Sequence, residues 1–314
     1  MPAVSILTPV CNRRDDLFAL AAGLERQTFR DFEWVIVDDG SDPAVATFLC
    51  PQAYPFPVRI LRHDTNLGIG AARNSAVAAA AAGLLIWLDS DSAACGADWL
   101  AGHVRAHEEG LPALGIARGE AFLLHSRVEP RNHGIAAATF RYSNWHTSCQ
   151  DHAYRMTKHH APTNNTSVPR EVFERVGCFD PAFQVAEDID WGLRALAAGV
   201  AMVYVPDLPV DHRDPATLGA VWRSYRKMGC FAARVRRKNP GSPYGWIYPK
   251  SVVGAALWAV PFALLFSAYT VKTWFHRDRR VVLYLPMLVL ANLANSVGMI
   301  DAARWGEGNR TYGP

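Results

Sequence analysis

The chain has 314 residues, of which 50% are hydrophobic and 19% are charged, and its formal net charge is +3. These values allow a sizeable core, exclude wholesale disorder and give no support for nucleic-acid binding. The six cysteines are scattered and form no CxxC pair, so neither a zinc ribbon nor a disulfide framework is indicated. The N-terminus has no basic segment followed by a cleavable apolar one, so we expect no signal peptide and a cytosolic start.

The first third of the sequence alternates the signals of strands and helices. Short apolar runs predict strands, and apolar residues at helical spacing predict helices between them. The predicted strands are Val4–Val10, Phe32–Val37, Val58–Arg62 and Leu84–Leu88, and the predicted helices are Asp15–Gln27 and Ile69–Ala82. Apolar strands that alternate with helices are typical of an α/β fold with a mainly parallel sheet covered on both faces.

Polar clusters lie at or just after the ends of three predicted strands, at Thr8–Asn12, Asp38–Ser41 and Asp89–Asp91. In a parallel sheet the ligand crevice lies beyond the carboxyl ends of the strands. We therefore expect the three clusters to converge in space and to form a binding site.

The remaining sequence is less regular. Residues Glu120–Pro169 are rich in histidine and only weakly periodic. The later segments predict helices at Arg170–Val176 and Glu187–Ala198, a strand at Met202–Val205, a basic and aromatic stretch at Thr217–Lys238 and a strongly apolar region from Val252 on.

Asp89-x-Asp91 sits at the carboxyl end of an apolar strand. Two carboxylates around a tight turn can share a divalent cation with pyrophosphate oxygens, and Mg²⁺ or Mn²⁺ suits such ligands. The cation would then assist departure of a diphosphate as a Lewis acid. The alternative for this triplet is a solvated turn.

Asp38-Asp39-Gly40-Ser41 also follows an apolar strand. A carboxylate here can accept a hydrogen bond from a nucleotide base or ribose, and Gly40 permits a tight turn. The alternative is a helix N-cap formed by Ser41 or Asp42, and both roles can hold together.

Arg73 follows the segment Asn66–Gly70 near a predicted helix start, where it can approach a phosphate or the nucleotide edge. Gly68 and Gly70 hint at a dinucleotide fingerprint. The third glycine and the later acidic residue of that fingerprint are missing, so a dehydrogenase is not favoured.

Glu187-Asp188 opens a predicted helix, where acidic side chains gain from the helix dipole. A carboxylate aimed into the crevice would serve as the general base for an acceptor hydroxyl, and direct in-line attack implies inversion at the sugar carbon. The alternative is an acidic first turn without a catalytic role.

Together these segments resemble glycosyltransferase family 2, which has the GT-A fold. Any one of them would be a weak signal, whereas their common order along the chain is specific. The matching segments are Val4–Asn12, Val35–Ser41, Asn66–Asn74, Ile86–Asp91, Val172–Phe183 and Glu187–Arg194.

The resemblance implies roles for individual residues. Asp188 looks like the catalytic base, with Glu187 beside it touching the acceptor or the loop. Asp91 looks like the metal ligand, Asp89 like a ribose or metal-water contact, and His212 is either a metal or diphosphate ligand or a structural residue. The nucleotide contacts implied by the resemblance are Thr8, Pro9, Asp39 and Arg73, and we add Asn12 and Asp38 from the same strand ends.

The acceptor side is less well defined. Trp191 departs from the leucine that often ends the family's acidic motif, and it can either pack or form part of an acceptor platform. Trp145 lies in the region where the family places a variable acceptor loop. The nearby His146, His152, His159 and His160, with Cys149, match no usual zinc-ligand spacing.

The C-terminal third suggests a membrane. Val252–Phe275 carries one charge and would form a helix about 36 Å long, against roughly 30 Å of hydrocarbon. Val281–Ile300 is uncharged, although Asn292 and Asn295 are costly in lipid. A spanning hairpin, interfacial helices and an apolar oligomer surface all fit, and we favour membrane attachment.

We therefore predict a GT-A domain at 1–215, basic interfacial helices at 216–250 and an apolar hairpin at 251–314. The predicted activity is inverting, Mn²⁺- or Mg²⁺-assisted transfer of a sugar from a nucleotide-diphosphate sugar. The predicted acceptor is lipid-linked or a surface polysaccharide, at the cytoplasmic face of the inner membrane. The rival hypotheses are a nucleotidyltransferase that makes nucleotide sugars and a non-catalytic membrane scaffold with a degenerate fold.

Overall fold

A computed structural model describes residues 1–157 and 162–306 and divides the chain into two compact units. Unit 1 comprises Met1–Glu129, His152–Pro181 and Glu187–His212. Unit 2 comprises Pro130–Asp151, Ala182–Ala186 and the chain from Arg213 on. The C-terminal helices thus share a unit with 130–151, a segment that the sequence-based division assigned to the catalytic domain.

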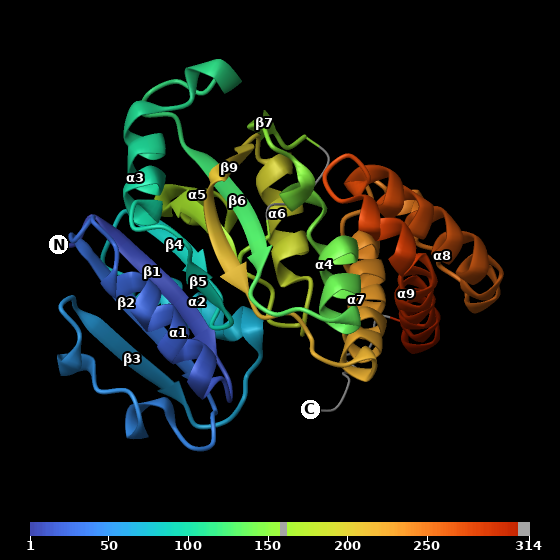
Figure 1. The fold of residues 1–314 in the computed structure, drawn as a ribbon, viewed down its shortest axis with the longest axis horizontal. Coiled ribbons are helices and arrows are strands. Elements are labelled where there is room, and N and C mark those ends of the chain that lie inside the picture. Colours follow the sequence, from blue (N-terminus) through green and yellow to red (C-terminus); the bar gives the residue numbers. More distant parts are fainter. Residues whose placement is uncertain (158–161, 307–314) are drawn as a thin grey trace. The chain divides into compact units, whose positions relative to one another are not determined.

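Unit 1 is built on a mixed sheet, which confirms the predicted α/β class. Its described strands follow the order β3-β2-β1-β4-β8-β6-β9-β5, with β7 paired to β9 (Figure 1). The strands are β1 Val4–Val10, β2 Phe32–Asp39, β3 Val58–His63, β4 Leu84–Leu88, β5 Ser92–Ala94, β6 Phe122–Pro130, β7 Tyr154–Arg155, β8 Asn165–Pro169 and β9 Ala201–His212.

The first four strands of the chain pair in parallel. β1 pairs in parallel with β2 and β4, and β2 pairs in parallel with β3. Beyond β4 the pairs β4–β8, β6–β8, β5–β9 and β7–β9 are antiparallel. The alternating strands and helices of the N-terminal third therefore account for one half of the sheet only.

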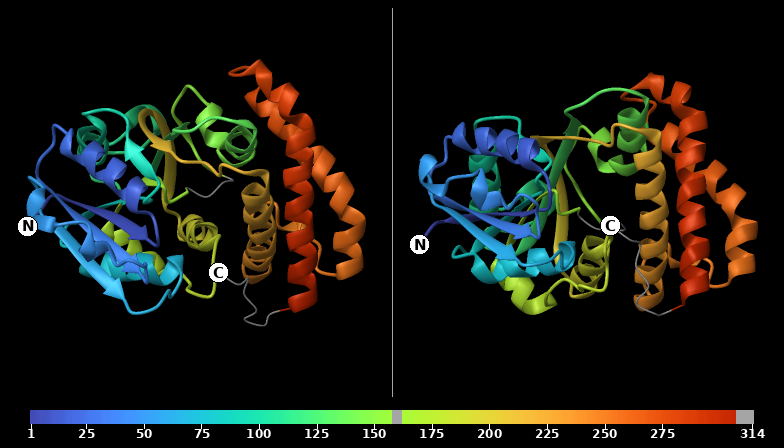
Figure 2. Two further views of the ribbon diagram at one scale, coloured as in Figure 1. Left: turned by 60° about the horizontal axis from the view of Figure 1, so that its bottom comes forward. Right: turned by 90° about the horizontal axis from the view of Figure 1, so that it is seen from below.

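Helices cover both faces of the parallel part. α1 (Arg14–Glu25) and α2 (Ile69–Ala79) lie on opposite faces of β1–β4 (Figure 2). Both match predicted helices to within three residues at each end. The other α-helices of unit 1 are α3 (Trp99–Glu109), α5 (Arg170–Val176) and α6 (Glu187–Ala197).

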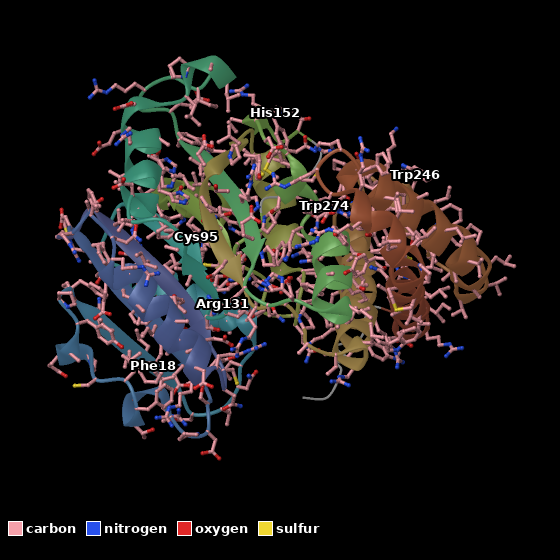
Figure 3. The ribbon with its side chains drawn as sticks, viewed as in Figure 1. Phe18, Cys95, Arg131, His152, Trp246 and Trp274 are labelled. Atoms are coloured by element: carbon pink, nitrogen blue, oxygen red, sulfur yellow. The ribbon has the colours of Figure 1, made fainter. Side chains whose placement is uncertain are left out.

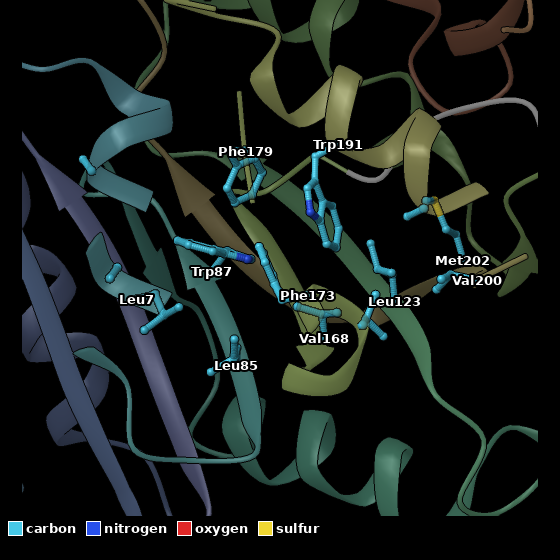
Figure 4. Packing of buried hydrophobic residues seen from close by; sticks show 14 of the residues in the cluster. Leu7, Leu85, Trp87, Leu123, Val168, Phe173, Phe179, Trp191, Val200 and Met202 are labelled. Carbon is cyan, nitrogen blue, oxygen red and sulfur yellow. The ribbon is translucent and has the colours of Figure 1, made fainter. Parts of the chain in front are cut away.

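The main core of unit 1 is aromatic. Trp87 on β4 packs edge-on against Phe179, with ring centroids 5.4 Å apart, and Trp191 on α6 stacks on Phe173 at 4.5 Å (Figure 4). Leucine, valine and methionine side chains from β1, β4, β6, β8 and β9 complete this cluster. The core therefore fixes α6 against the sheet, and with it the start of the acidic segment at Glu187.

Unit 2 is helical. Besides α4 (Ile135–Asn144) it holds three long helices, α7 (Leu218–Lys238), α8 (Val252–Trp274) and α9 (Leu285–Trp305). α8 and the segment Arg279–Trp305 are long and apolar enough to cross a membrane, by length and composition. α7 begins at a Thr217 N-cap, whose hydroxyl accepts from the backbone N–H of Ala220.

Two buried histidines on α3 share one hydroxyl of unit 1. His103 Nδ1 and His107 Nε2 each lie 2.8 Å from Ser167 Oγ on β8, so the hydroxyl can donate to one ring and accept from the other. Burial lowers the pKa of His103 to about 3 and the pKa of His107 to about 4. Both rings are therefore neutral in the folded protein above pH 5.

We predict that acid destabilises unit 1 through this pair. In the unfolded chain both histidines take up protons near pH 6.5, so stability falls as the pH drops below 6.5 and continues to fall toward the two folded-state values. The slope should reach about 1.4 kcal/mol per pH unit for each histidine. Denaturant unfolding between pH 7 and 4.5 measures it. An identical slope in a His103→Gln/His107→Gln variant would contradict this prediction.

Candidate active site at the carboxyl ends of β1, β2 and β4

Two loops at the ends of β1 and β2 are tied to each other by reciprocal hydrogen bonds. Asn12 Oδ1 accepts from the N–H of Asp42 at 2.8 Å, and the N–H of Asn12 donates to Ser41 Oγ at 3.0 Å. Asn12 has a positive φ of 56°, a conformation that asparagine tolerates. The convergence predicted for these two clusters is therefore present.

Asp38 holds its own loop together. Its carboxylate is buried and accepts from the N–H groups of Ser41 and Val45 and from Arg62. Burial acts to raise the pKa of Asp38, but these hydrogen bonds outweigh it and lower the pKa. Protein donors thus hold the Asp38 carboxylate in its own loop, and the nucleotide contact expected from this side chain stays a prediction.

Asp39 fastens the next loop to the sheet. Oδ1 accepts from Leu67 N at 2.9 Å and lies 2.7 Å from His63 Nδ1, and Oδ2 accepts from Gly68 N at 2.9 Å. His63 also lies 2.9 Å from Ser75 Oγ on α2 through Nε2. One backbone donor leaves Oδ2 able to accept a second hydrogen bond.

Sequence reasoning missed His63. It ends β3 directly opposite Asp39 in the parallel register, so the strand-end rule that selected the other clusters applies to it as well.

The turn after β2 requires a glycine. Gly40 has φ +76°, and a Cβ there would lie 2.6 Å from the backbone nitrogen of Asn66. The loops after β2 and β3 therefore touch backbone to backbone at this point.

We predict that Gly40→Ala lowers the free energy of unfolding by at least about 1 kcal/mol, since it adds both a strained φ and a steric overlap. Gly83→Ala is the matched control, because a Cβ at Gly83 meets nothing within 4 Å. Urea denaturation compares the two variants, and equal midpoints would refute the requirement for glycine at position 40.

Thr8 and Pro9 lie near the carboxyl end of β1. Thr8 is fully buried, and its Oγ1 accepts from Trp34 Nε1 at 2.9 Å. The Thr8 hydroxyl is thus engaged by Trp34, and the nucleotide contact expected from this residue stays a prediction. Pro9 is also buried.

The turn after β4 carries Asp89 and Asp91, and β-sheet register brings His212 to it. β5 pairs with β9 so that Ser92 lies opposite His212, which places His212 Nε2 3.4 Å from Asp91 Oδ1. Arg13, after β1, lies 3.9 Å from Asp91 Oδ2. Arg13 thus links the turn at Asp89–Asp91 to the loop after β1. The sequence alone did not identify this arginine.

The two carboxyls of this turn differ electrostatically. Burial acts to raise the pKa of Asp91, but His212 and Arg13 outweigh it and hold the pKa at about 2. Burial also raises the pKa of Asp89, with a further contribution from Asp91 and against the opposing charge of Arg73. Asp91 is therefore the carboxylate that stays ionised most readily.

Arg73 links the β4 turn to α6. Its guanidinium donates to Asp89 Oδ1 at 2.9 Å and forms an ion pair with Glu187. The side chain is only 4% exposed and lies 5.8 Å from the ring centroids of both Trp87 and Phe179. Arg73, predicted to contact the nucleotide, is thus engaged by two carboxylates, and Glu187, predicted to touch the acceptor or the loop, is buried against it.

Asp188 differs from its acidic neighbours. It is only partly buried, and its Oδ1 accepts from the N–H of Ile189 at 2.8 Å. Asp190, by contrast, is fully buried and bonds Arg194 at 3.0 Å. The residue before α6, Ala186, has a positive φ of 66°, a strained conformation for a side chain with a Cβ. Among the acids of this turn, Asp188 therefore offers the more accessible carboxylate.

Neither predicted acceptor tryptophan presents its ring to solvent. Trp191 is 2% exposed and donates to the carbonyl of Gly177 at 2.7 Å. Trp145, in unit 2, is 7% exposed and donates to Asp214 Oδ1 at 3.2 Å. Both indoles are used in packing, which was one of the two alternatives for Trp191, and an acceptor role for either residue stays a prediction.

The chemistry of the donors fits a divalent cation that arrives with a diphosphate. Magnesium is usually held by one or two carboxylates plus substrate phosphates rather than by an all-protein cage. Asp91, Asp89 and His212 supply oxygen and nitrogen donors at one turn. Within the described residues no group of three or more His, Cys, Asp or Glu side chains is placed so that it could hold a metal ion by itself, and His159 and His160 of the histidine-rich stretch lie outside those residues.

We predict that Arg73→Met lowers the free energy of unfolding by about 3 kcal/mol or more, because it leaves Glu187 and Asp89 without their buried cation. Arg155→Met serves as the control: Arg155 is 47% exposed and 3.9 Å from Glu120, and its loss should cost less than about 1 kcal/mol. Denaturant titration measures both, and equal losses would argue against the buried link.

Carboxylates, a histidine and arginines thus gather beyond the ends of β1, β2 and β4 of an α/β sheet, which is where such sheets bind their ligands. A model of the family "Glycosyl transferase family 2" matches residues 5–177. The chain belongs to this family and has a fold of the GT-A type.

Similar proteins include the validoxylamine A glucosyltransferase of Streptomyces hygroscopicus subsp. jinggangensis, 30% identical over 64% of this chain and 53% of that protein. The matched region thus spans about half of that relative.

Solved structures share the fold. The mannosyltransferase PcManGT from Pyrobaculum calidifontis, in complex with GDP-Man and Mn²⁺, has a TM-score of 0.64 and 16% identity, covering 97% of this chain and 87% of that one. Residues 1–349 of S. aureus TarS, in complex with UDP, have a TM-score of 0.50 and 14% identity, covering 96% and 90%.

Proposed function

We propose that this protein moves a sugar from a nucleotide-diphosphate sugar to an acceptor hydroxyl with inversion at the sugar carbon. The observation that carries the proposal is the link from the Asp89-x-Asp91 turn through Arg73 to the start of α6, where Asp188 stands. The bound GDP-Man and UDP of the two structural neighbours support a nucleotide-linked donor.

The donor would lie over the joined loops after β1, β2 and β3. Asp39 offers remaining acceptor capacity to a base or ribose, and Asn12 and the backbone at Pro9 border the same edge. Because Asp38 and Thr8 are committed to protein partners, they act by shaping this surface. Arg73 likewise acts by holding Asp89 and Glu187.

Asp91 and His212, with Asp89, would hold Mn²⁺ or Mg²⁺. When bound, the cation would supply Lewis-acid stabilisation of the diphosphate leaving group. The low pKa of Asp91 keeps its carboxylate ionised at neutral pH, which favours binding of a divalent cation. The Mn²⁺ in the mannosyltransferase complex supports this assignment.

Asp188 would accept the proton of the acceptor hydroxyl. Its partly exposed carboxylate sits in the first turn of α6, where the helix dipole favours the charged form. Glu187 is the positioning residue, since its ion pair with Arg73 fixes the start of the helix that carries the base. One base on the acceptor side is the arrangement that direct displacement requires.

The proposed acceptor is a lipid-linked sugar or a surface polysaccharide, and the sugar transferred is a hexose. The two long apolar helices of unit 2 support a membrane location, and the face we propose is the cytoplasmic face of the inner membrane. With two such helices in the described residues, transfer of one sugar per turnover is favoured over synthesis of a polymer through a channel.

The deciding experiment measures release of nucleoside diphosphate from UDP-, GDP- and dTDP-sugars in mild detergent, with Mn²⁺, with Mg²⁺ and with EDTA. We expect metal-dependent release from one donor, reduced at least about a hundredfold in Asp91→Ala and in Asp188→Asn. The control variant is Asp151→Asn, whose side chain is 64% exposed and pairs with Arg277.

Measuring nucleotide binding and the effect of EDTA separates failure of the transferase proposal from failure of the metal role alone. If isothermal titration detects no nucleotide binding and no donor is turned over, the proposal fails and the non-catalytic scaffold replaces it. Release that is equal with and without EDTA would retain the transferase and refute the metal role.

A further inference from the structure

One face of α8 is apolar and open to solvent within unit 2. Leu257 is 76% exposed, and Leu283, in the turn that follows α8, is 79% exposed. Trp246, just before α8, is 79% exposed, whereas Trp274 near its end is only 4% exposed (Figure 3). Further large exposed side chains on this side of the unit are Val253, Val260, Leu264, Leu265, Tyr269, Phe275 and Val282.

The other face of α8 is a protein interface with α9. Ser267 Oγ is 3.1 Å from the side-chain nitrogen of Asn292, and Ser296 Oγ donates to the carbonyl of Ala259 at 3.2 Å. Asn292, one of the two asparagines expected to be costly in lipid, thus has a protein partner, and so does Ser296. The exposed surface of α8 is left almost purely apolar.

α9 also packs closely along α7. A Cβ at Gly229 would overlap the backbone oxygen of Asn295, and a Cβ at Gly298 would overlap the backbone oxygen of Arg226. Arg226 pairs with Asp301 at 2.7 Å. The two helices therefore run side by side, with α9 between α7 and α8 (Figure 2).

This packing determines how the apolar helices can meet a bilayer. α7 carries cations along its length, namely Arg223, Arg226, Lys227, Arg234, Arg236, Arg237 and Lys238. If α9 crossed the membrane, α7 would lie beside it at the same depth, and these cations would enter the hydrocarbon. Burial of so many charges is strongly unfavourable, so a spanning α9 is incompatible with the α7–α9 contact.

Positively charged side chains lie at both ends of α8, where they could contact anionic lipid headgroups. Lys250 precedes the helix, Lys272 lies near its end, and Arg279 follows it, and all three are exposed. Arg280 is also exposed but pairs with Asp278 at 2.9 Å. Cations at both ends of an apolar face can contact the headgroups of an anionic membrane, and the α7–α9 contact is the observation that favours an in-plane helix over a spanning one.

We propose that α8 lies in the plane of one leaflet of an anionic bilayer, with its outer face and Leu283 in the acyl region. The connector 275–284 then stays on the same side of the membrane as α7. This extends the membrane location given above and is independent of the proposed chemistry, because it concerns residues outside the candidate active site.

Flotation of the full-length protein with liposomes tests the surface. We expect binding to vesicles of phosphatidylglycerol and phosphatidylcholine, weaker binding to phosphatidylcholine alone, and about a tenfold loss in Leu257→Glu/Leu264→Glu. Ile135→Glu, which changes a 60% exposed side chain at the start of α4, is the matched control. Equal flotation of both variants would overturn the proposal, as would a lipid-free dimer that the double substitution dissociates.

Labelling from one side distinguishes an in-plane helix from a spanning one. In sealed inverted membrane vesicles from an expression host, an impermeant maleimide should react with Arg279→Cys as readily as with the exposed native Cys178. Labelling of position 279 only after detergent is added would place the connector in the lumen and overturn the proposal. Nucleotide turnover in the same vesicles reports separately on the proposed activity.

Discussion

The candidate site depends on one buried cation. Arg73 is fixed between Trp87 and Phe179 and neutralises Asp89 and Glu187, which belong to segments almost 100 residues apart. A guanidinium suits this task because its planar fork can donate in two directions while its charge stays constant. Since Glu187 opens α6, the same interaction sets the position of Asp188. The proposed metal-binding turn and the proposed base are thereby linked through one buried guanidinium.

The loops beyond the parallel strands are ordered by bonds to one another. Asn12 exchanges hydrogen bonds with Ser41 and Asp42, and Asp39 ties down Leu67 and Gly68. Each bond removes freedom that a ligand would otherwise have to remove on binding, so the surface is largely preformed. The antiparallel β5–β9 pair extends this order to His212, which reaches Asp91 through register alone.

The sequence predicted the parallel half of the sheet well, because its strands are continuous apolar runs that end in polar clusters. It did not predict helix α3 or strands β6 and β8, because buried polar residues interrupt the apolar periodicity of these segments. Asn165, for example, lies inside β8 and bonds Trp99 and the carbonyls of Arg127 and Leu208. The convergence of the site was predictable, but the use of each side chain was not. Asp38 and Trp191 are committed to partners that only the tertiary fold brings to them.

The two faces of α8 differ in what they contact: the inner face packs against α9, and the outer face is exposed. The inner face supplies the hydrogen bonds and packing that hold α9, while the outer face buries nothing within the unit. Substitutions on the outer face therefore leave the folded state almost unchanged in energy. If the outer face binds lipid as proposed, substitutions there would change how long the protein stays at the membrane without altering how it folds.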